Sequence, residues 1–485
     1  MNDVTVNAVR SNWERTAALV GIALLVLLLL ASSATEARAA GFTRGFVDTV
    51  WESPGNPSQT PRQWAANAYG AGARVAEVEV DWSRYEPHAP RRRTSSDNPA
   101  NPAYGNWSNL DAIVERLTVA HVQPMFLITD APQWAEAKGR LRSDTEAYEP
   151  NDNALSAFSR ALATRYDGNY PSPTKRRSSL PRVRYYQAWA EANLSIKLAP
   201  QWKEVHGSFE NIGASTYRGM LNAIYAGIKA AKPSDTVIFT GLEAYGDAPG
   251  GQRVQPVTFL ENVLCLNSSL QKVCDKAAHF DVLASDPYEV GSPTTPAINT
   301  DDASAPDMAK LTKVLQAGLR ARTALPDAAK PLWVTEFGYD SDPPNPAGLP
   351  VAEQARWLEQ SLYVFWSEHV NTVLWYLIRD EPGRDYATTY YSGIYFYSGK
   401  KKPSYTAYQF PLVVAALGRK SQVWGMAPTT GTVLVQERLA GHWQTVDSFH
   451  AAAGAVFDGL IAAPTAKTSF YRAIDGSRRS LTWTY

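Results

Sequence analysis

The sequence predicts an α/β fold in which eight strand–helix units form a barrel and a small all-β module follows. Three observations predict it. From residue 41 onwards, short apolar runs alternate with longer stretches of helical periodicity. About 370 residues hold eight such units, which is typical of a TIM barrel with inserted loops. After residue 417 only short apolar runs remain, and glycines separate them.

Each expected strand is a short apolar run, and each precedes a stretch with helical spacing of its apolar residues. The strands are expected at 43–48, 74–80, 124–129, 183–189, 236–240, 280–284, 332–335 and 372–377. The helices are expected at 62–70, 110–121, 154–166, 216–231, 257–266, 307–322, 352–369 and 404–410. A doubly wound open sheet is the alternative fold, but it usually carries a glycine-rich nucleotide turn after its first strand, and the sequence lacks one there.

The N-terminal segment predicts a signal peptide at 1–40. Arg10 and Arg15 precede a 15-residue apolar run at 17–31, and an Ala-Arg-Ala cleavage pattern follows at 37–39. The run is shorter than the roughly 20 residues that span a bilayer. We therefore expect cleavage after Ala39 or Ala40 and a secreted or cell-surface protein. A retained N-terminal membrane anchor is the alternative, because flanking residues could extend the span.

Two cysteines, Cys265 and Cys274, lie nine positions apart after an expected helix. In an oxidising compartment outside the cell, a local disulfide between them is favoured. Two separate buried thiols are the other interpretation.

The charge balance, the histidine spacing and the missing motifs of the sequence argue against several function classes. Forty-seven basic and 47 acidic residues cancel, so the basic surface that nucleic-acid binding requires is not expected. The seven histidines are dispersed without ligand spacing, and we expect neither a metal nor another cofactor. A G-x-S-x-G nucleophile motif is also missing from the sequence.

Two glutamates end apolar strands: Glu191 follows the fourth expected strand, and Glu336 follows the seventh. A carboxylate beside a core is costly unless it is paired or hydrogen-bonded. Enzymatic cleavage of a glycosidic bond requires at least two acidic side chains that face one cavity. Glu191 and Glu336 are therefore the candidate catalytic residues.

The segments around these glutamates resemble clan A glycoside hydrolases. Residues 186–194 read Tyr-Gln-Ala-Trp-Ala-Glu-Ala-Asn-Leu, similar to the W-N-E-P-N-L segment that ends the clan's fourth barrel strand. Residues 333–338 read Trp-Val-Thr-Glu-Phe-Gly, similar to the W-x-T-E-x-G segment that ends its seventh strand. The resemblance covers residues 41–415. It implies a retaining glycosidase in which Glu336 is the nucleophile and Glu191 the acid/base.

The resemblance also implies supporting residues at the substrate. Tyr288, after the sixth strand, would hydrogen-bond the nucleophile, and Arg74 would help to keep it charged. Trp375 on the eighth strand resembles the aromatic platform beneath the scissile sugar, and Trp82 and Trp134 could line the cleft. For each of these side chains, core packing or a structural salt bridge is the alternative role.

This sequence departs from the clan's pattern at three positions. Ala190 stands where the clan has an Asn that contacts the sugar 2-hydroxyl, a contact worth several kcal/mol in the transition state. Ala192 replaces a proline, while Asn193 is kept and is expected at the substrate. Asp286 replaces a histidine. Because of Ala190, either the substrate lacks that contact, another residue supplies it, or catalysis is weakened.

The expected organisation is a signal peptide at 1–40, a barrel at 41–417 and a β-sandwich-like module at 418–485. The module could bind carbohydrate or the cell surface, or simply cover the barrel. The expected function is a secreted retaining glycoside hydrolase acting as a monomer on a glycoside, oligosaccharide or polysaccharide. The alternative is a weakened or inactive glycan-binding barrel protein of the cell envelope.

Overall fold

A computed structural model of the chain describes residues 41–52, 59–90, 96–140, 147–386, 388–464 and 468–485. The chain divides into two compact units, Met1–Phe42 and Thr43–Tyr485, and almost all described residues belong to the second. The expected signal peptide at 1–40 lies outside the described residues. Within the described ranges, every helix is too short or too polar to cross a membrane.

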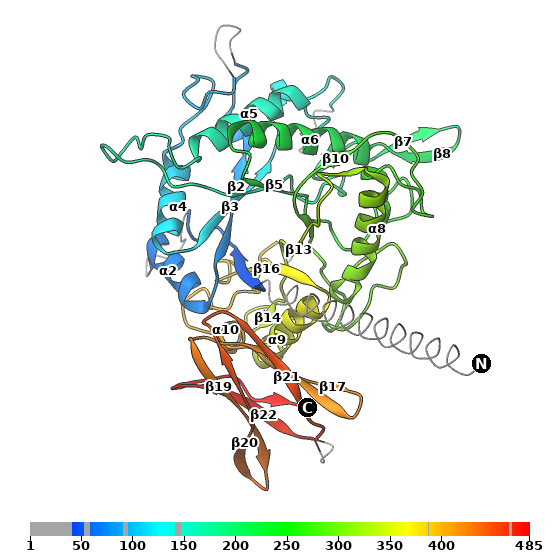
Figure 1. The fold of residues 1–485 in the computed structure, drawn as a ribbon. Helices are drawn as coiled ribbons and strands as arrows, with labels where there is room; N and C mark the ends of the chain where they lie inside the picture. Colours follow the sequence, from blue (N-terminus) through cyan, green and yellow to red (C-terminus); the bar gives the residue numbers. More distant parts are fainter. Residues whose placement is uncertain (1–40, 53–58, 91–95, 141–146, 387, 465–467) are drawn as a thin grey trace, which may run out of the picture. The chain divides into compact units, whose positions relative to one another are not determined.

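Eight parallel strands form one sheet in the order β11-β13-β16-β1-β2-β3-β5-β9 (Figure 1). They are β1 (Thr43–Val47), β2 (Val75–Asp81), β3 (Gln123–Thr129), β5 (Tyr185–Ala188), β9 (Thr236–Ile238), β11 (Leu283–Ser285), β13 (Leu332–Val334) and β16 (Val370–Tyr376). Parallel bridges Ile238↔Val282 and Glu243↔Asp286 connect the two ends of this order and close the sheet. The predicted (β/α)8 barrel is therefore confirmed.

A helix follows each barrel strand, as expected. These helices are α2 (Pro61–Ala71), α4 (Ser108–Val119), α5 (Asp152–Arg165), α6 (Gly213–Ala231), α7 (Pro256–Val263), α8 (Met308–Ala321), α9 (Val351–Ser367) and α10 (Pro403–Gln409). Local sequence sets the ends of α2. The Thr60 side chain accepts a hydrogen bond from the Gln63 N–H, Pro61 occupies the first turn, and Gly72 at φ 109° ends the helix.

Short elements occupy the connections between these units. They are α3 (Trp82–Tyr85), η1 (Gln133–Ala135), η2 (Ala305–Asp307), β4 (Ala147–Tyr148), β6 (Leu198–Ala199), β7 (Trp202–Val205), β8 (Ser208–Asn211), β10 (Ala278–His279), β12 (Ala324–Leu325), β14 (Ser341–Asp342) and β15 (Leu349–Pro350). The structure joins Cys265 and Cys274, in the connection after α7, as a disulfide with a Cα–Cα distance of 5.3 Å.

Alternate residues of the barrel strands face the interior, because side chains along a strand point to opposite faces. The interior cluster includes Val75 of β2 and Leu374 of β16, with Tyr376 packed against it. The same alternation turns Glu77 and Glu79 of β2 inwards. Strand β2 therefore brings two carboxyl groups into the pocket.

The C-terminal module is all-β, as predicted, and its strands form antiparallel sheets. One sheet holds β17 (Leu412–Leu417), β18 (Lys420–Met426) and β21 (Val456–Ala462). The other holds β19 (Gly431–Leu439), β20 (His442–Ala451), β22 (Phe470–Asp475), β23 (Arg478–Arg479) and β24 (Trp483–Thr484). The strand β17 begins before residue 418, because its apolar run pairs with β18 rather than continuing the barrel.

Candidate active site

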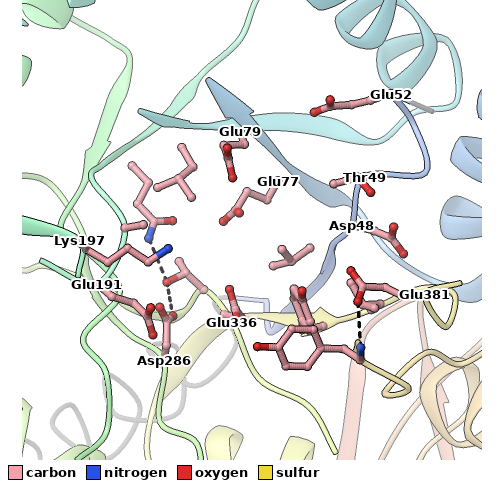
Figure 2. A pocket seen from close by; sticks show the side chains of 18 residues that line it. Asp48, Thr49, Glu52, Glu77, Glu79, Glu191, Lys197, Asp286, Glu336 and Glu381 are labelled. Atoms are coloured by element: carbon pink, nitrogen blue, oxygen red, sulfur yellow. Dashed lines mark hydrogen bonds between the residues drawn. The ribbon is translucent and has the colours of Figure 1, made fainter. Parts of the chain in front are cut away.

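The carboxyl ends of the barrel strands surround a pocket of about 280 Å³ (Figure 2). Glu191 and Glu336 both line it. The charged residues of its described lining are eight acids and one lysine: Asp48, Glu52, Glu77, Glu79, Glu191, Asp286, Glu336, Glu381 and Lys197. Although the whole chain has no net charge, acidic groups are concentrated in this pocket.

Glu191 lies just beyond β5 in a strained turn. Its φ is 36° and that of Trp189 is 76°, both in the left-handed region that non-glycine residues rarely adopt. The Ala192 N–H donates to Thr240 Oγ1 at 3.0 Å, which fixes the turn against the segment that follows β9. Such strain persists only where surrounding contacts hold it, and it is common at functional sites.

Glu336 follows β13 and receives a hydrogen bond at one carboxyl oxygen. The Tyr288 hydroxyl donates to Glu336 Oε1 at 2.8 Å, the contact that the resemblance implies. Burial and the negative charge of Glu191 raise the pKa of Glu336 to about 7, while Tyr288 and Lys197 act to lower it. Tyr288 therefore favours the ionised form of Glu336.

Burial also raises the pKa of Glu191, and Lys197 partly offsets the increase. A second carboxyl group, Glu243, shares a hydrogen bond with Glu191, and one of the two must hold a proton to donate it. Burial and the charge of Glu191 raise the pKa of Glu243 to about 7. Both pKa values are thus raised, which favours the protonated form of the Glu191–Glu243 pair.

Three polar residues of the pocket lining form a short chain of hydrogen bonds. Gln187 Nε2 donates to Thr335 Oγ1 at 3.3 Å, and Thr335 Oγ1 donates to Asp286 Oδ1 at 2.7 Å. Asp286 fits because residue 241 is glycine: a Cβ there would lie 1.9 Å from Asp286 Oδ2. Burial, Glu336 and Glu191 hold the pKa of Asp286 well above its usual range.

The expected role of Arg74 is wrong. Arg74 precedes β2 and so lies at the amino end of the strand, whereas the pocket is at the carboxyl ends. Its guanidinium donates to the Ala73 carbonyl at 2.8 Å and lies 4.3 Å from the centre of the Tyr69 ring. Among the described residues that line the pocket, none is an arginine.

The three tryptophans expected at the substrate lie outside the described pocket lining. Trp375 is fully buried, because strand alternation turns it away from the interior that Leu374 and Tyr376 face. Tyr376 is the aromatic residue of β16 that lines the pocket. The indole N–H groups of Trp82 and Trp134 both bond Glu86, at its carboxylate and its carbonyl respectively, so both rings have structural roles.

Asn193 also has a structural role rather than the expected contact with substrate. Its Nδ2 donates to the carbonyls of Glu243 and Val254, and its Oδ1 accepts from the Glu243 N–H at 3.1 Å. Asn193 is fully buried by these contacts. It ties the turn that carries Glu191 to the segments after β9.

Sequence reasoning missed Glu77, Glu79, Lys197, Glu243 and Tyr376. Strand alternation in 75–81 could have revealed Glu77 and Glu79, because they share a face with Val75. Glu243 and Lys197 lie on connections, where no periodic pattern indicates direction. Within the described ranges, no group of three or more His, Cys, Asp or Glu side chains has the arrangement of a metal site.

Comparisons with known proteins agree with this fold. Neither a protein-family model nor a curated protein sequence matches the chain. A solved family 39 glycoside hydrolase from the gut symbiont Bacteroides cellulosilyticus WH2 is similar, with 16% identity and a TM-score of 0.53 over 88% of this chain and 82% of that one.

Two further solved structures show weaker likeness. A glucosidase from Croceicoccus marinus has 10% identity and a TM-score of 0.49, over 87% of this chain and 94% of that one. A family 30 endoxylanase from Clostridium papyrosolvens C71 has 12% identity and a TM-score of 0.43, over 87% of this chain and 96% of that one. The likeness to the family 39 glycoside hydrolase agrees with the closed parallel barrel and shows that the two proteins share this fold.

Proposed function

We propose that this protein is a glycoside hydrolase that cleaves O-glycosidic bonds with retention, using Glu336 as nucleophile and Glu191 as acid/base. One observation carries the proposal. Carboxyl groups from the ends of the fourth and seventh barrel strands line one pocket, and Glu191 is close enough to raise the pKa of Glu336. A retaining enzyme requires two carboxyl groups about 5–5.5 Å apart on either side of the scissile bond.

The environments of the two groups suit these roles. Burial raises the pKa of Glu191, which favours the protonated form that can pass a proton to the leaving oxygen as Glu336 attacks the anomeric carbon. The hydrogen bond from Tyr288 stabilises the ionised form of Glu336 before attack. Once the glycosyl ester forms, Glu336 is neutral, so the pKa of Glu191 falls and Glu191 can take a proton from water.

Ala190 lines the same pocket and cannot contact a 2-hydroxyl through its side chain. This departure favours a second candidate, a barrel that binds glycans without cleaving them. The two proposals differ in whether a bond is broken, so turnover separates them.

The test is hydrolysis of a panel of α- and β-nitrophenyl glycosides by the wild-type protein and the variants Glu191→Gln and Glu336→Gln. Glu336→Gln is expected to abolish turnover, and Glu191→Gln to reduce kcat by about 10²–10⁴-fold. Glu359→Gln is the matched control, because Glu359 is a buried acid on α9 outside the described lining of the pocket. Its activity is expected to equal that of the wild type.

Retention is measured separately by NMR, from the anomeric configuration of the first product. An inverted product would contradict the double-displacement mechanism. Full activity of Glu336→Gln would exclude Glu336 as nucleophile, and glycan binding without turnover on any glycoside would support the binding protein.

We also propose that the protein is exported and acts as a monomer. The apolar run at 17–31 and the Ala-Arg-Ala pattern support export. N-terminal sequencing of the mature protein would begin at Ala40 or Gly41 after cleavage, and at Met1 or Asn2 if the segment is retained as an anchor. Light scattering would measure the mass in solution.

A further inference from the structure

Glu77 is a buried acid without a hydrogen-bonding partner. The residue is 7% exposed, it comes from the centre of β2, and its side chain lines the pocket that Glu336 also lines (Figure 2). In the part of the chain that the structure describes, no side chain or backbone group hydrogen-bonds its carboxyl oxygens. Lys197 acts on it only from a distance, since it forms no described salt bridge.

A buried carboxyl group in this state is costly to the folded protein. Burial, Glu336, Asp286 and Glu79 all hold the pKa of Glu77 well above its usual range, and Lys197 alone acts to lower it. A structural acid at such a site is normally paired, as Asp380 is with Lys402 at 2.6 Å. The missing partner at Glu77 is therefore expected to be a ligand.

The chemistry of the pocket identifies this ligand as a cation. A neutral hydroxyl could donate one hydrogen bond to an ionised Glu77, but it would leave in place the cost of ionising Glu77 beside Glu79 and Asp286. A protonated amine offers three N–H donors and a positive charge, so it relieves both deficits. The described acids lack the arrangement of a metal site, which favours an organic cation over a metal ion.

The position of Glu77 indicates where the amine is attached. Glu77 and Glu336 line the same pocket (Figure 2), and of the charged groups Glu336 has the largest effect on the pKa of Glu77. In the proposed function Glu336 attacks C1 of the sugar. The ring neighbours of C1 are C2 and the ring oxygen, and only C2 carries a substituent. Ala190 is consistent with this assignment, because the side chain expected to bind a 2-hydroxyl is missing.

Resting on the proposed function, we infer that the sugar bound at the catalytic carboxyl groups is a 2-amino-2-deoxy sugar with a free amine, and that Glu77 binds its ammonium group. An N-acetylated sugar would lack the charge and would place a bulky group against buried carboxyls. The glycoside substrate is thus a glycan that contains unacetylated amino sugars.

The test measures equilibrium binding of sugars by calorimetry at low salt and near-neutral pH. Three matched sets of sugars are compared: glucosamine, galactosamine and mannosamine, each with its neutral and its N-acetylated counterpart. In at least one set, the amino sugar is expected to bind at least about tenfold more tightly than both counterparts. Glu77→Gln is expected to remove this preference. Glu359→Gln is the control, because Glu359 is a buried acid on α9 outside the described lining of the pocket.

Glu77→Gln keeps the size of the side chain and removes its charge, so its melting temperature is expected to equal or exceed that of the wild type. Equal binding within every set, no binding of any amino sugar, or an unchanged preference in Glu77→Gln would overturn the inference. Hydrolysis of neutral glycosides alone would overturn it and leave the proposed hydrolase standing. Amino-sugar binding without hydrolysis of any glycoside would contradict the proposed hydrolase and leave the inference about the bound sugar standing.

Discussion

Single side chains set the charge of the two central carboxyl groups. Burial and mutual repulsion oppose ionisation of Glu336, and the hydrogen bond from Tyr288 favours it. The raised pKa of about 7 means that Glu336 is protonated at acidic pH and ionised at alkaline pH. Because attack requires the ionised form, activity is expected to fall as the pH drops below about 7.

Tyr288→Phe tests this balance. Loss of a hydrogen bond to a charged group costs about 1.5–3 kcal/mol, so the acid limb of the kcat/KM profile should move up by about one to two pH units. The measurement is the pH–rate profile, and Tyr339→Phe is the control because its hydroxyl faces Ser361 rather than Glu336. An acid limb that stays in place would show that Tyr288 does not stabilise the charge on Glu336.

At the scale of strands and connections, alternation decides which side chains reach the pocket. The fourth and seventh strands could be predicted because their apolar runs stop at an acid. The inward direction of Tyr376, rather than Trp375, depends on strand register, which an apolar run does not reveal. The role of Asn193 depends on the fold of the segments at 243 and 254, so the local sequence could not predict it.

Asn193→Ala tests the connection that holds Glu191. The substitution leaves buried groups of Glu243 and Val254 unpaired, so the free energy of unfolding should fall by about 1–3 kcal/mol. Turnover should fall too, because the strained turn loses its support. The measurements are urea unfolding and kcat. The control is Asn153→Ala, at an exposed position of α5, which should change the free energy of unfolding by less than about 0.5 kcal/mol. An equally small effect of Asn193→Ala would contradict the structural role assigned to Asn193.

At the scale of the whole molecule, the C-terminal module and the barrel belong to one compact unit. Trp483 of β24 donates to the Val414 carbonyl at 2.9 Å and lies under the guanidinium of Arg356 on α9. The apolar run of β17 could not be assigned from sequence, since a short run does not reveal its partner strand. These contacts favour a module that covers the barrel, one of the roles that the sequence left open.

Trp483→Ala tests whether the two parts unfold together. Removal of a buried tryptophan costs about 3–5 kcal/mol, so the melting temperature of a single calorimetric transition should fall. Trp443→Ala on β20 is the control, because Trp443 is only partly buried and its effect should be smaller. Two separate transitions, with only one of them affected by Trp483→Ala, would contradict a shared unit.

The most direct test of the central claim is to trap the glycosyl ester on Glu336. Glu191→Ala is incubated with the dinitrophenyl glycoside that the wild type cleaves fastest, since this leaving group departs without an acid but the ester then lacks its base. Mass spectrometry should find one glycosyl group on the peptide that contains Glu336, and none in the double variant with Glu336→Gln. A label on another residue, or cleavage without any ester, would contradict the assignment.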